Sequence, residues 1–138
     1  MPLEYHYDSA MHAVVTTVTG RVDANDTIAS LQRVRDDVYV PSGFIDIVDL
    51  SLVEDTTIDA ADAKDIVSVV SEIRSRKGLT GTAFFAPTEL SLGIAQMFQE
   101  MLEELGLWVK IYRDWPEMSA DITKRLRDNR STQNVSCS

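Results

Sequence analysis

The apolar and polar positions of the chain follow two rhythms, one typical of β-strands and the other typical of helices. Residues 82–86 form a short apolar run that ends at Pro87, as expected of a strand that is covered on both faces. Over residues 90–105, apolar side chains recur at helical spacing, and glutamine and glutamate occupy the opposite side. Residues 107–112 are again strand-like. This succession predicts a strand, a helix and a second strand joined by very short connections.

The N-terminal part of the chain shows the same mixture of element types. Residues 3–7 alternate between apolar and polar side chains, and residues 12–18 are rich in β-branched ones, so we expect an antiparallel hairpin. We expect Gly20 to end the second of these strands. Apolar residues at helical spacing over 28–38 predict a helix, and residues 44–50 predict a buried strand.

Polar residues mark the starts of two further helices. Thr56, Thr57 and Asp59 fit a capping box at the start of a helix that ends before Gly78. Asp114 begins a second box of this kind, and an apolar stripe follows it. We therefore expect both threonines of the first box to lie at a helix N-terminus.

The predicted order of elements is β-β-α-β-α-β-α-β-α. Strands that alternate with helices of this length imply right-handed crossovers. The predicted fold class is α/β, with a single mainly parallel sheet, an antiparallel strand at its N-terminal edge, and helices packed on it. One domain over residues 1–127 accounts for the pattern. Residues 128–138 have almost nothing to bury, and we expect a disordered polar tail there.

Composition narrows the classes of function. The chain has 138 residues, 44% of them hydrophobic, and a formal net charge of -9. This negative charge would repel a phosphate backbone, so we expect no nucleic-acid partner. No apolar run is long enough to span a membrane, the N-terminus does not have the pattern of a signal peptide, and the single cysteine, Cys137, cannot form an intrachain disulfide. We therefore expect a cytoplasmic protein.

No stretch carries the signature of an enzyme, a nucleotide site or a metal site. The motifs of nucleophilic, phosphate-binding and zinc enzymes are missing, and neither His6 nor His12 has another metal ligand at the usual spacing. We expect a protein that is not an enzyme and needs no cofactor or metal. Four acidic residues surround one helix start: Glu54, Asp55, Asp59 and Asp62. Stabilisation of the helix dipole explains them better than a cation site does.

Two groups of residues are candidates for binding. Asp49 and Ser51 come at the carboxyl end of a buried strand, the edge at which parallel sheets place ligands and functional loops. The second group lies in the first turns of the helix after Pro87. There we expect Ser91 to bond back to the helix start, Leu92 to be exposed on the polar side, and Gly93 to allow a close approach. An exposed Leu92 also fits a homodimer interface.

Four segments of the chain resemble a known family: VTGRVDANDTIASL, IVDLS, AFFAPTELSLGIAQMF and VKIYRDWPEMSADI. Together they are similar to bacterial SpoIIAA-like proteins of the STAS type, over most of residues 12–126. The resemblance implies a compact α/β domain that serves as a protein-interaction module. Its most familiar form is an anti-sigma factor antagonist controlled by serine phosphorylation. The resemblance does not name the partner protein of this chain.

The resemblance also bears on the helix start near Thr56. In the antagonists, an Asp-Ser-Ser-Gly stretch follows the corresponding strand. The nearest match here is Asp55, Thr56, Thr57 and Ile58, in which threonine replaces serine and the glycine is missing. Each threonine is a candidate phosphoacceptor or helix cap, and the acidic residues around them favour the cap. STAS-like domains also share their layout with SEC14-like domains, which leaves open a carrier or sensor of a small apolar, lipid-like ligand.

Overall fold

The computed structural model describes residues 2–136 of the chain, with side chains over residues 2–129. Within that range, strands and helices follow one another in the predicted order. Their bounds are β1 Leu3–Asp8, β2 Ala13–Val22, α1 Ala24–Asp36, β3 Ile45–Thr56, α2 Ala60–Lys77, β4 Gly81–Phe85, α3 Glu89–Glu104, β5 Trp108–Tyr112 and α4 Trp115–Ser136. The order of elements predicted from the sequence is confirmed.

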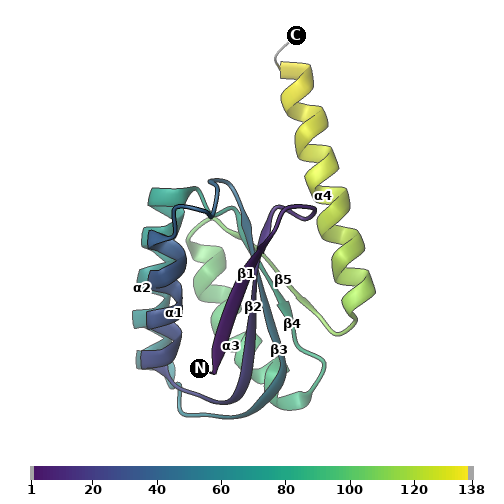
Figure 1. Ribbon diagram of the computed structural model, residues 1–138. Helices are drawn as coiled ribbons and strands as arrows, with labels where there is room; N and C mark the ends of the chain where they lie inside the picture. The colour runs from purple at the N-terminus through teal and green to yellow at the C-terminus, as the bar shows by residue number, and fades with distance from the viewer. Residues whose placement is uncertain (1, 137–138) are drawn as a thin grey trace.

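The five strands of the described chain form a sheet in the order β1-β2-β3-β4-β5. β1 pairs with β2 in the antiparallel direction, and the other neighbouring strands are parallel. Each parallel connection passes through a helix, because a tight turn cannot join two parallel strands. The predicted α/β fold, with an antiparallel strand at the N-terminal edge, is confirmed (Figure 1).

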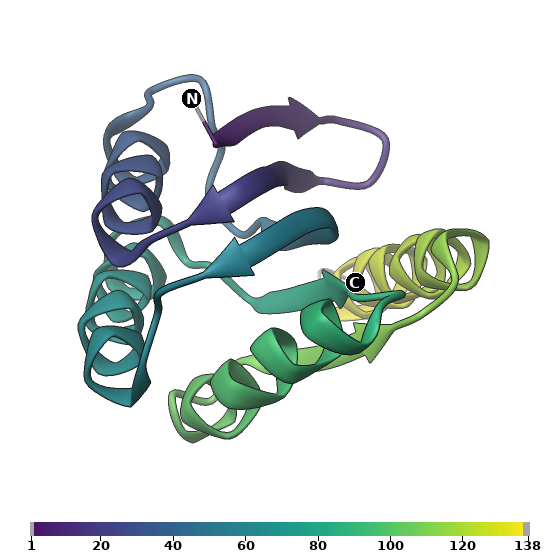
Figure 2. The same ribbon diagram turned by 90° about the horizontal axis from the view of Figure 1, so that it is seen from below.

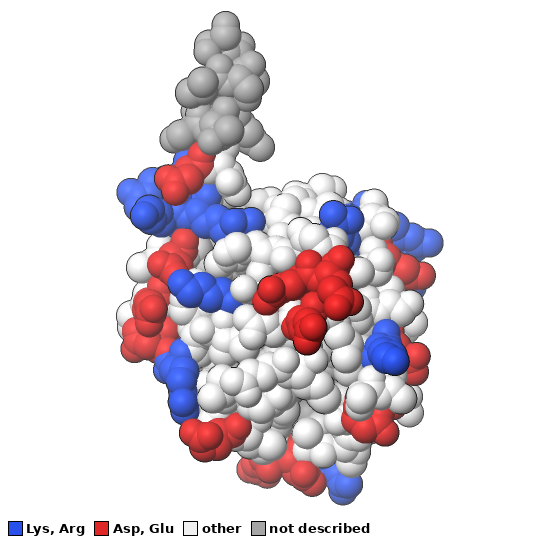
Figure 3. Space-filling model, turned by 180° about the vertical axis from the view of Figure 1, so that it is seen from behind, with Lys and Arg blue, Asp and Glu red and all other residues white. Residues whose placement is uncertain are grey.

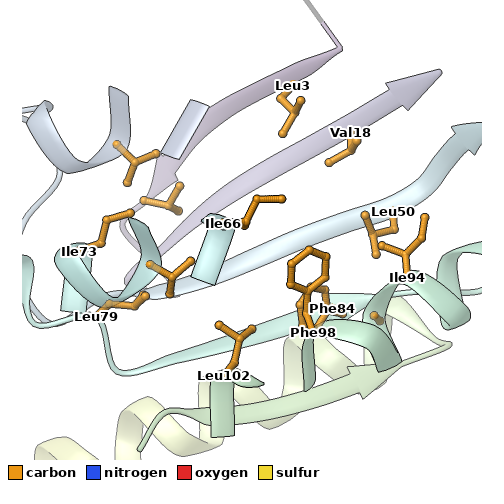
Figure 4. Close-up of a cluster of buried hydrophobic side chains, with 14 of the residues drawn as sticks. Leu3, Val18, Leu50, Ile66, Ile73, Leu79, Phe84, Ile94, Phe98 and Leu102 are labelled. Atoms are coloured by element: carbon orange, nitrogen blue, oxygen red, sulfur yellow. The ribbon is translucent and has the colours of Figure 1, made fainter. Parts of the chain in front are cut away.

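The two faces of the sheet are covered by different helices. α1, α2 and α3 lie on one face, which we call the three-helix face, and α4 lies on the other, which we call the α4 face (Figures 1 and 2). Strand residues alternate between them, so Val48 of β3 packs on the three-helix side and Ile47 on the α4 side. Figure 4 shows Ile66 of α2 and Phe98 of α3 among the side chains between the helices and the sheet. The predicted direction of helix packing is therefore confirmed.

Two strands run further than the sequence pattern predicts. β2 continues through Gly20 to Val22, and β3 continues past Leu50 to Thr56. The two extensions pair with each other, with Val22 opposite Thr56 and a register shift between Gly20 and Arg21. Gly20 has a φ of +67°, a left-handed conformation that glycine adopts without steric cost. Gly20 therefore forms an irregularity within the strand instead of ending it.

The start of α2 differs from the prediction. Its N-cap is Asp59, whose carboxylate accepts a hydrogen bond from the amide of Asp62 at 2.9 Å. The Asp62 carboxylate in turn accepts one from the amide of Asp59 at 3.2 Å, which completes a capping box. Thr56 and Thr57 do not cap this helix, because the longer β3 includes Thr56 and moves the helix start towards the C-terminus.

The first and last helices differ from the prediction in extent. α1 ends at Asp36, so Val38 lies beyond the helix with 86% of its surface exposed. α4 continues to Ser136, where we expected a disordered tail over residues 128–138, and it projects beyond the body of the protein (Figure 1). A helix that is already nucleated adds each further residue cheaply, even where there is little to bury. Residues 137 and 138 lie outside the described residues, and the domain boundary at residue 127 stays a prediction.

Candidate functional site

The binding candidates lie around one edge of the sheet, which we call the carboxyl edge. The parallel strands β2 to β5 all end there, and the helix that follows each strand begins there. The connections into α1, α2 and α3 lie at the bottom of Figure 1. This arrangement brings the connection before α2 and the first turns of α3 to the same end of the molecule, although they are far apart in the sequence.

Asp49 and Ser51 form a local pair within β3. The Oδ1 atom of Asp49 accepts a hydrogen bond from the amide of Ser51 at 2.9 Å and another from its hydroxyl at 2.6 Å. Both side chains are half-buried. The local hydrogen bonds explain the pairing of these two residue types, and a role for them in binding stays a prediction.

The two candidate phosphoacceptors have different surroundings. The Thr56 hydroxyl donates a hydrogen bond to the carbonyl oxygen of Val22 at 3.1 Å and accepts one from the amide of Ile58 at 3.1 Å. Thr56 thereby holds the last residues of β3 against β2. Thr57 is exposed, and no hydrogen bond of its side chain occurs within the described residues. Thr57 is therefore the more accessible hydroxyl of the two.

The acidic residues before α2 are mostly engaged in local structure. Asp55 lies 3.7 Å from the guanidinium group of Arg21 on the neighbouring strand, and both side chains are largely exposed. Asp59 and Asp62 form the capping box of α2. These contacts support the interpretation that the acidic group stabilises a helix start.

The first turn of α3 contains a second capping box. The Thr88 hydroxyl oxygen accepts a hydrogen bond from the amide of Ser91 at 3.1 Å, and the Ser91 hydroxyl oxygen accepts one from the amide of Thr88 at 2.9 Å. Ser91 is completely buried. The expectation that Ser91 bonds back to the helix start is confirmed, and these contacts account for its hydroxyl.

In the first turn of α3, the exposed leucine is not the one that the sequence pattern predicts. Leu92 is half-buried, whereas Leu90 has 39% of its surface exposed. The small residues Ser91 and Ala95 face the core together with the apolar stripe, which turns Leu90 outwards. Gly93 is exposed, and a Cβ atom placed on it would meet no atom within 4 Å. No contact within the described chain therefore requires glycine at this position.

The histidines make different contacts. The Nε2 atom of His12 lies 3.1 Å from the carbonyl oxygen of Ser42, an atom that can only accept a hydrogen bond. The Nδ1 atom of His12 lies 2.6 Å from the hydroxyl oxygen of Tyr7. His6 is exposed. Among the described residues there is no group of three or more His, Cys, Asp or Glu side chains that could hold a metal ion. In the same part of the chain, no helix is both long enough and apolar enough to cross a membrane.

A partly enclosed cavity of about 90 Å³ lies on the three-helix face of the sheet. Residues from β1 to β4 and from α1 to α3 line it, and most of them are apolar. Several of the lining side chains are labelled in Figure 4: Val18, Leu50, Ile66, Phe84, Ile94 and Phe98. The cavity therefore lies in the middle of the larger hydrophobic core.

Among the described residues, Asp46 of β3 is the one ionisable side chain that lines this cavity. The Thr16 hydroxyl donates a long hydrogen bond of 3.4 Å to its Oδ1. Burial raises the pKa of the Asp46 carboxyl to about 7, and the hydrogen bond from Thr16 offsets only part of this rise. No motif in the sequence indicated a role for Asp46. The signal was its alternation with Val48 and Leu50, which places a charge on the apolar side of a strand.

Charged side chains cover the surface unevenly. Figure 3 shows basic side chains where α4 leaves the body, and a separate group of acidic side chains near the centre of the same view. Lys124 and Arg127 of α4 are exposed, whereas the Arg125 guanidinium lies 4.7 Å from the centre of the Trp108 ring. Arg125, one of these basic side chains of α4, thus helps to hold the helix against the sheet.

No protein-family model and no curated protein sequence matches the chain. Solved structures do match it. The anti-sigma factor antagonist SpoIIAA in its unphosphorylated form has a TM-score of 0.52 and 15% sequence identity, covering 91% of this chain and 97% of that one. An uncharacterized protein of the DUF3478 family with a SpoIIAA-like fold, from Shewanella loihica PV-4, has a TM-score of 0.55 and 10% identity, covering 83% of this chain and 87% of that one.

These likenesses define the fold of the chain. The described residues form a mainly parallel sheet with an antiparallel edge strand, backed by helices. That architecture is the SpoIIAA/STAS fold. The resemblance noted in the sequence is confirmed for the fold. Similarity at this level of identity does not carry partners or activity from one protein to another.

Proposed function

We propose that this protein is a cytoplasmic, non-enzymatic regulatory module that acts by binding another protein. Its fold carries the proposal, because one protein with this fold is an anti-sigma factor antagonist, a protein named for its effect on another protein. The hydrogen bonds of the candidate site's hydroxyl groups also favour a role in binding over one in catalysis. The hydroxyl groups of Ser51, Thr56 and Ser91 are committed to hydrogen bonds within the chain.

The binding surface that we propose is the exposed side of the first half of α3. Leu90 exposes an apolar side chain there, and Gly93 lies almost one turn later on the same side. Glycine within a helix costs roughly 1 kcal/mol relative to alanine. Since nothing within the described chain lies near the Cβ position of Gly93, a partner that approaches the helix backbone closely would explain this cost.

Two substitutions test this surface, and the first should have opposite effects on stability and on binding. Gly93→Ala should stabilise α3 by about 0.5 to 1 kcal/mol and yet weaken the complex, because the added methyl group blocks a close approach. Leu90→Glu should weaken the complex further. Gln32→Glu, which adds the same charge to the exposed surface of α1, should leave binding unchanged.

The measurement is quantitative cross-linking and mass spectrometry of the tagged full chain in extracts of its own cells. Proteins cross-linked to the wild type and to Gln32→Glu, but depleted for Leu90→Glu and Gly93→Ala, would support the α3 surface. Equal recovery of the same proteins by all four chains would show that the partner binds elsewhere.

A second copy of the chain is one candidate occupant of the same surface. Leu92, the residue that we expected at a homodimer interface, is half-buried, so Leu90 is the better residue to test. Sedimentation equilibrium at high protein concentration should give a dimer mass for the wild type and a monomer mass for Leu90→Glu. A monomer mass for both chains would leave a different protein as the partner.

We also propose that phosphorylation at Thr56 or Thr57 does not switch this module. The amides at the start of α2 already have the Asp59 cap, and the carboxylates nearby would repel a phosphate on Thr57. Intact-mass and fragment spectra of the protein from its own cells test this. An 80 Da adduct mapped to Thr57 would restore a phosphorylation switch like that of the antagonists.

The second candidate function is the carriage or sensing of a small apolar ligand. The cavity on the three-helix face favours it, because its lining is mostly apolar and contains one carboxyl group. Native mass spectrometry of the purified protein tests this function. A retained small molecule would support it, and its loss on filling the cavity would locate the site.

A further inference from the structure

The cavity on the three-helix face holds a carboxyl group that lacks a matching donor. An ionised carboxylate can accept about four hydrogen bonds. Asp46 accepts one from Thr16, at 3.4 Å. The other polar side chains that line the cavity are the hydroxyls of Thr27, Ser30 and Thr82, and none of them carries a positive charge. An ionised carboxylate without a partner is costly in an apolar wall, so the lining by itself does not explain why this position carries an ionisable group.

The position of Asp46 is not explained by the fold either. The neighbouring inward residues of β3, Val48 and Leu50, contribute apolar surface to the same cavity. A residue of similar size without a charge, such as asparagine, would fill the space at lower cost. The missing component is a group that supplies hydrogen-bond donors and a positive charge from within the cavity.

We propose that this cavity binds a small apolar amine, whose ammonium group pairs with the Asp46 carboxylate. The proposal rests on the second candidate function and adds the chemical class of the ligand and the residue that selects it. An ammonium group offers three donors and the compensating charge. A fatty acid would place a second carboxylate beside Asp46, and an alcohol would leave the charge unpaired. The apolar tail would lie against Val18, Leu50 and Phe84.

The volume of the cavity limits the size of the ligand. About 90 Å³ is smaller than an apolar cavity of roughly 150 Å³ that holds benzene, so the ligand must be smaller than a six-carbon ring. A linear amine with three carbon atoms is therefore a suitable probe. A ligand this small binds weakly, which makes nuclear magnetic resonance titration of the labelled full chain the appropriate measurement.

Binding of an amine should depend on pH in a defined way. Among the lining residues from β1, β2, β3, β4, α1, α2 and α3, Asp46 is the one titratable group. Burial raises its pKa to about 7, whereas an alkyl amine stays protonated well above that pH. The ionised fraction of Asp46 then rises from roughly a tenth at pH 6 to nine tenths at pH 8, so the affinity for the amine should rise about tenfold.

The experiment titrates the chain with n-propylamine, n-propanol and propionate at pH 6 and pH 8. We expect n-propylamine to shift the amide resonances of residues that line the cavity, with about tenfold tighter binding at pH 8. Asp46→Asn should weaken amine binding at least tenfold and remove its pH dependence. Asp65→Asn, which removes the same charge from the exposed surface of α2, should bind like the wild type.

A second variant keeps the test decisive if Asp46→Asn does not fold. Ser30→Leu on α1 reduces the cavity without changing Asp46, and it should abolish the shifts caused by n-propylamine. Undiminished amine binding by either folded variant would overturn the proposal.

The three probes also separate the proposal from the function on which it rests. If n-propanol or propionate binds as tightly as n-propylamine, the amine class is wrong and a site for small apolar ligands remains. If none of the three shifts the cavity resonances of the wild type, both the amine class and the ligand function are overturned.

Discussion

The two faces of the sheet solve the problem of buried polar groups in different ways. On the α4 face, the Asp121 carboxylate accepts hydrogen bonds from the Tyr112 hydroxyl at 2.8 Å and from the Lys110 ammonium at 2.9 Å. The hydrogen bond from Lys110 helps to hold the pKa of Asp121 below its usual range, and burial raises that of the Tyr112 hydroxyl. Asp121, Tyr112 and Lys110 therefore satisfy one another, whereas the Nε atom of Arg125 is buried on the same side with no hydrogen-bond partner among the described residues.

The three-helix face contains a polar group without such compensation. Asp46 lies against the cavity in the larger core, and within the part of the chain that the structure describes its carboxyl group has only the long hydrogen bond from Thr16. The comparison indicates that α4 is attached by ordinary packing and surface polar contacts. The three-helix face instead keeps a cavity and a poorly paired carboxyl group, features that cost stability and that a ligand would compensate. The predictions below test this difference between the faces.

The largest effect is expected for Phe98→Ala on the three-helix face. Phe98 is 7% exposed and packs in the main core beside the cavity, so its removal should lower the free energy of unfolding by about 3 to 5 kcal/mol. Urea denaturation measures this loss. Gln96→Ala on the exposed side of α3 is the control and should change stability by less than about 0.5 kcal/mol. A loss of less than about 1 kcal/mol for Phe98→Ala would mean that the packing of α3 is misassigned.

The second effect is a dependence of stability on pH that comes from Asp46. Its pKa rises from 3.8 to about 7 on folding, so the folded chain binds more protons than the unfolded chain between these values. Stability from this group is therefore highest below about pH 4 and falls as the pH rises towards 7. At about 1.4 kcal/mol for each pKa unit, the total loss is up to roughly 4 kcal/mol.

Asp46→Asn isolates this contribution. The difference in unfolding free energy between Asp46→Asn and the wild type should grow in favour of the variant from pH 4.5 to pH 8. Urea denaturation of both chains across this range measures it. A constant difference would show that Asp46 ionises as freely in the folded chain as in the unfolded one.

A smaller loss is expected for Met118→Ala on the α4 face. Met118 is fully buried in the smaller cluster, and its truncation should cost about 2 to 3 kcal/mol, near the lower end of the range for such changes. The loss of stability stays small because α4 is the one helix on this face and can shift to reduce the cavity that the truncation leaves. A loss larger than that of Phe98→Ala, measured by the same urea melts, would reverse the ranking of the two faces.

The smallest effect concerns the start of α2. Asp59→Ala removes the N-cap and should cost about 0.5 to 2 kcal/mol. Thr57→Ala should change stability by less than about 0.5 kcal/mol, since its hydroxyl makes no hydrogen bond within the described residues. Thermal unfolding followed by circular dichroism compares the two variants. Equal losses would return Thr57 to a structural role at this helix start.

Local patterns were sufficient for the order of the elements and for much of the core. The spacing of Ile66, Val70 and Ile73 predicted the buried side of α2, and Gly78 predicted its end. Both signals lie within a few residues of the feature that they determine, because helical hydrogen bonds and caps are local. Ser91 at the start of α3 was predictable for the same reason.

The candidate site was less predictable, because its features depend on contacts between distant segments. The extension of β3 to Thr56 exists because β2 continues to Val22 beside it, and this pairing decides that Asp59 caps α2 instead of Thr56 or Thr57. The exposure of Leu90 in place of Leu92 follows from how closely α3 packs on the core.

By itself, the sequence determined the alternation of strands and helices and the apolar side of most of them, since these depend on neighbours in the chain. Only the tertiary structure decided that α4 covers one face of the sheet and that the other face keeps a cavity beside Asp46. Alternation along β3 places Asp46 on a face, but the energy of its charge depends on what covers that face. The covering residues come from α1, α2 and α3, so the raised pKa and the unfilled hydrogen-bonding capacity of Asp46 arise only in the folded protein.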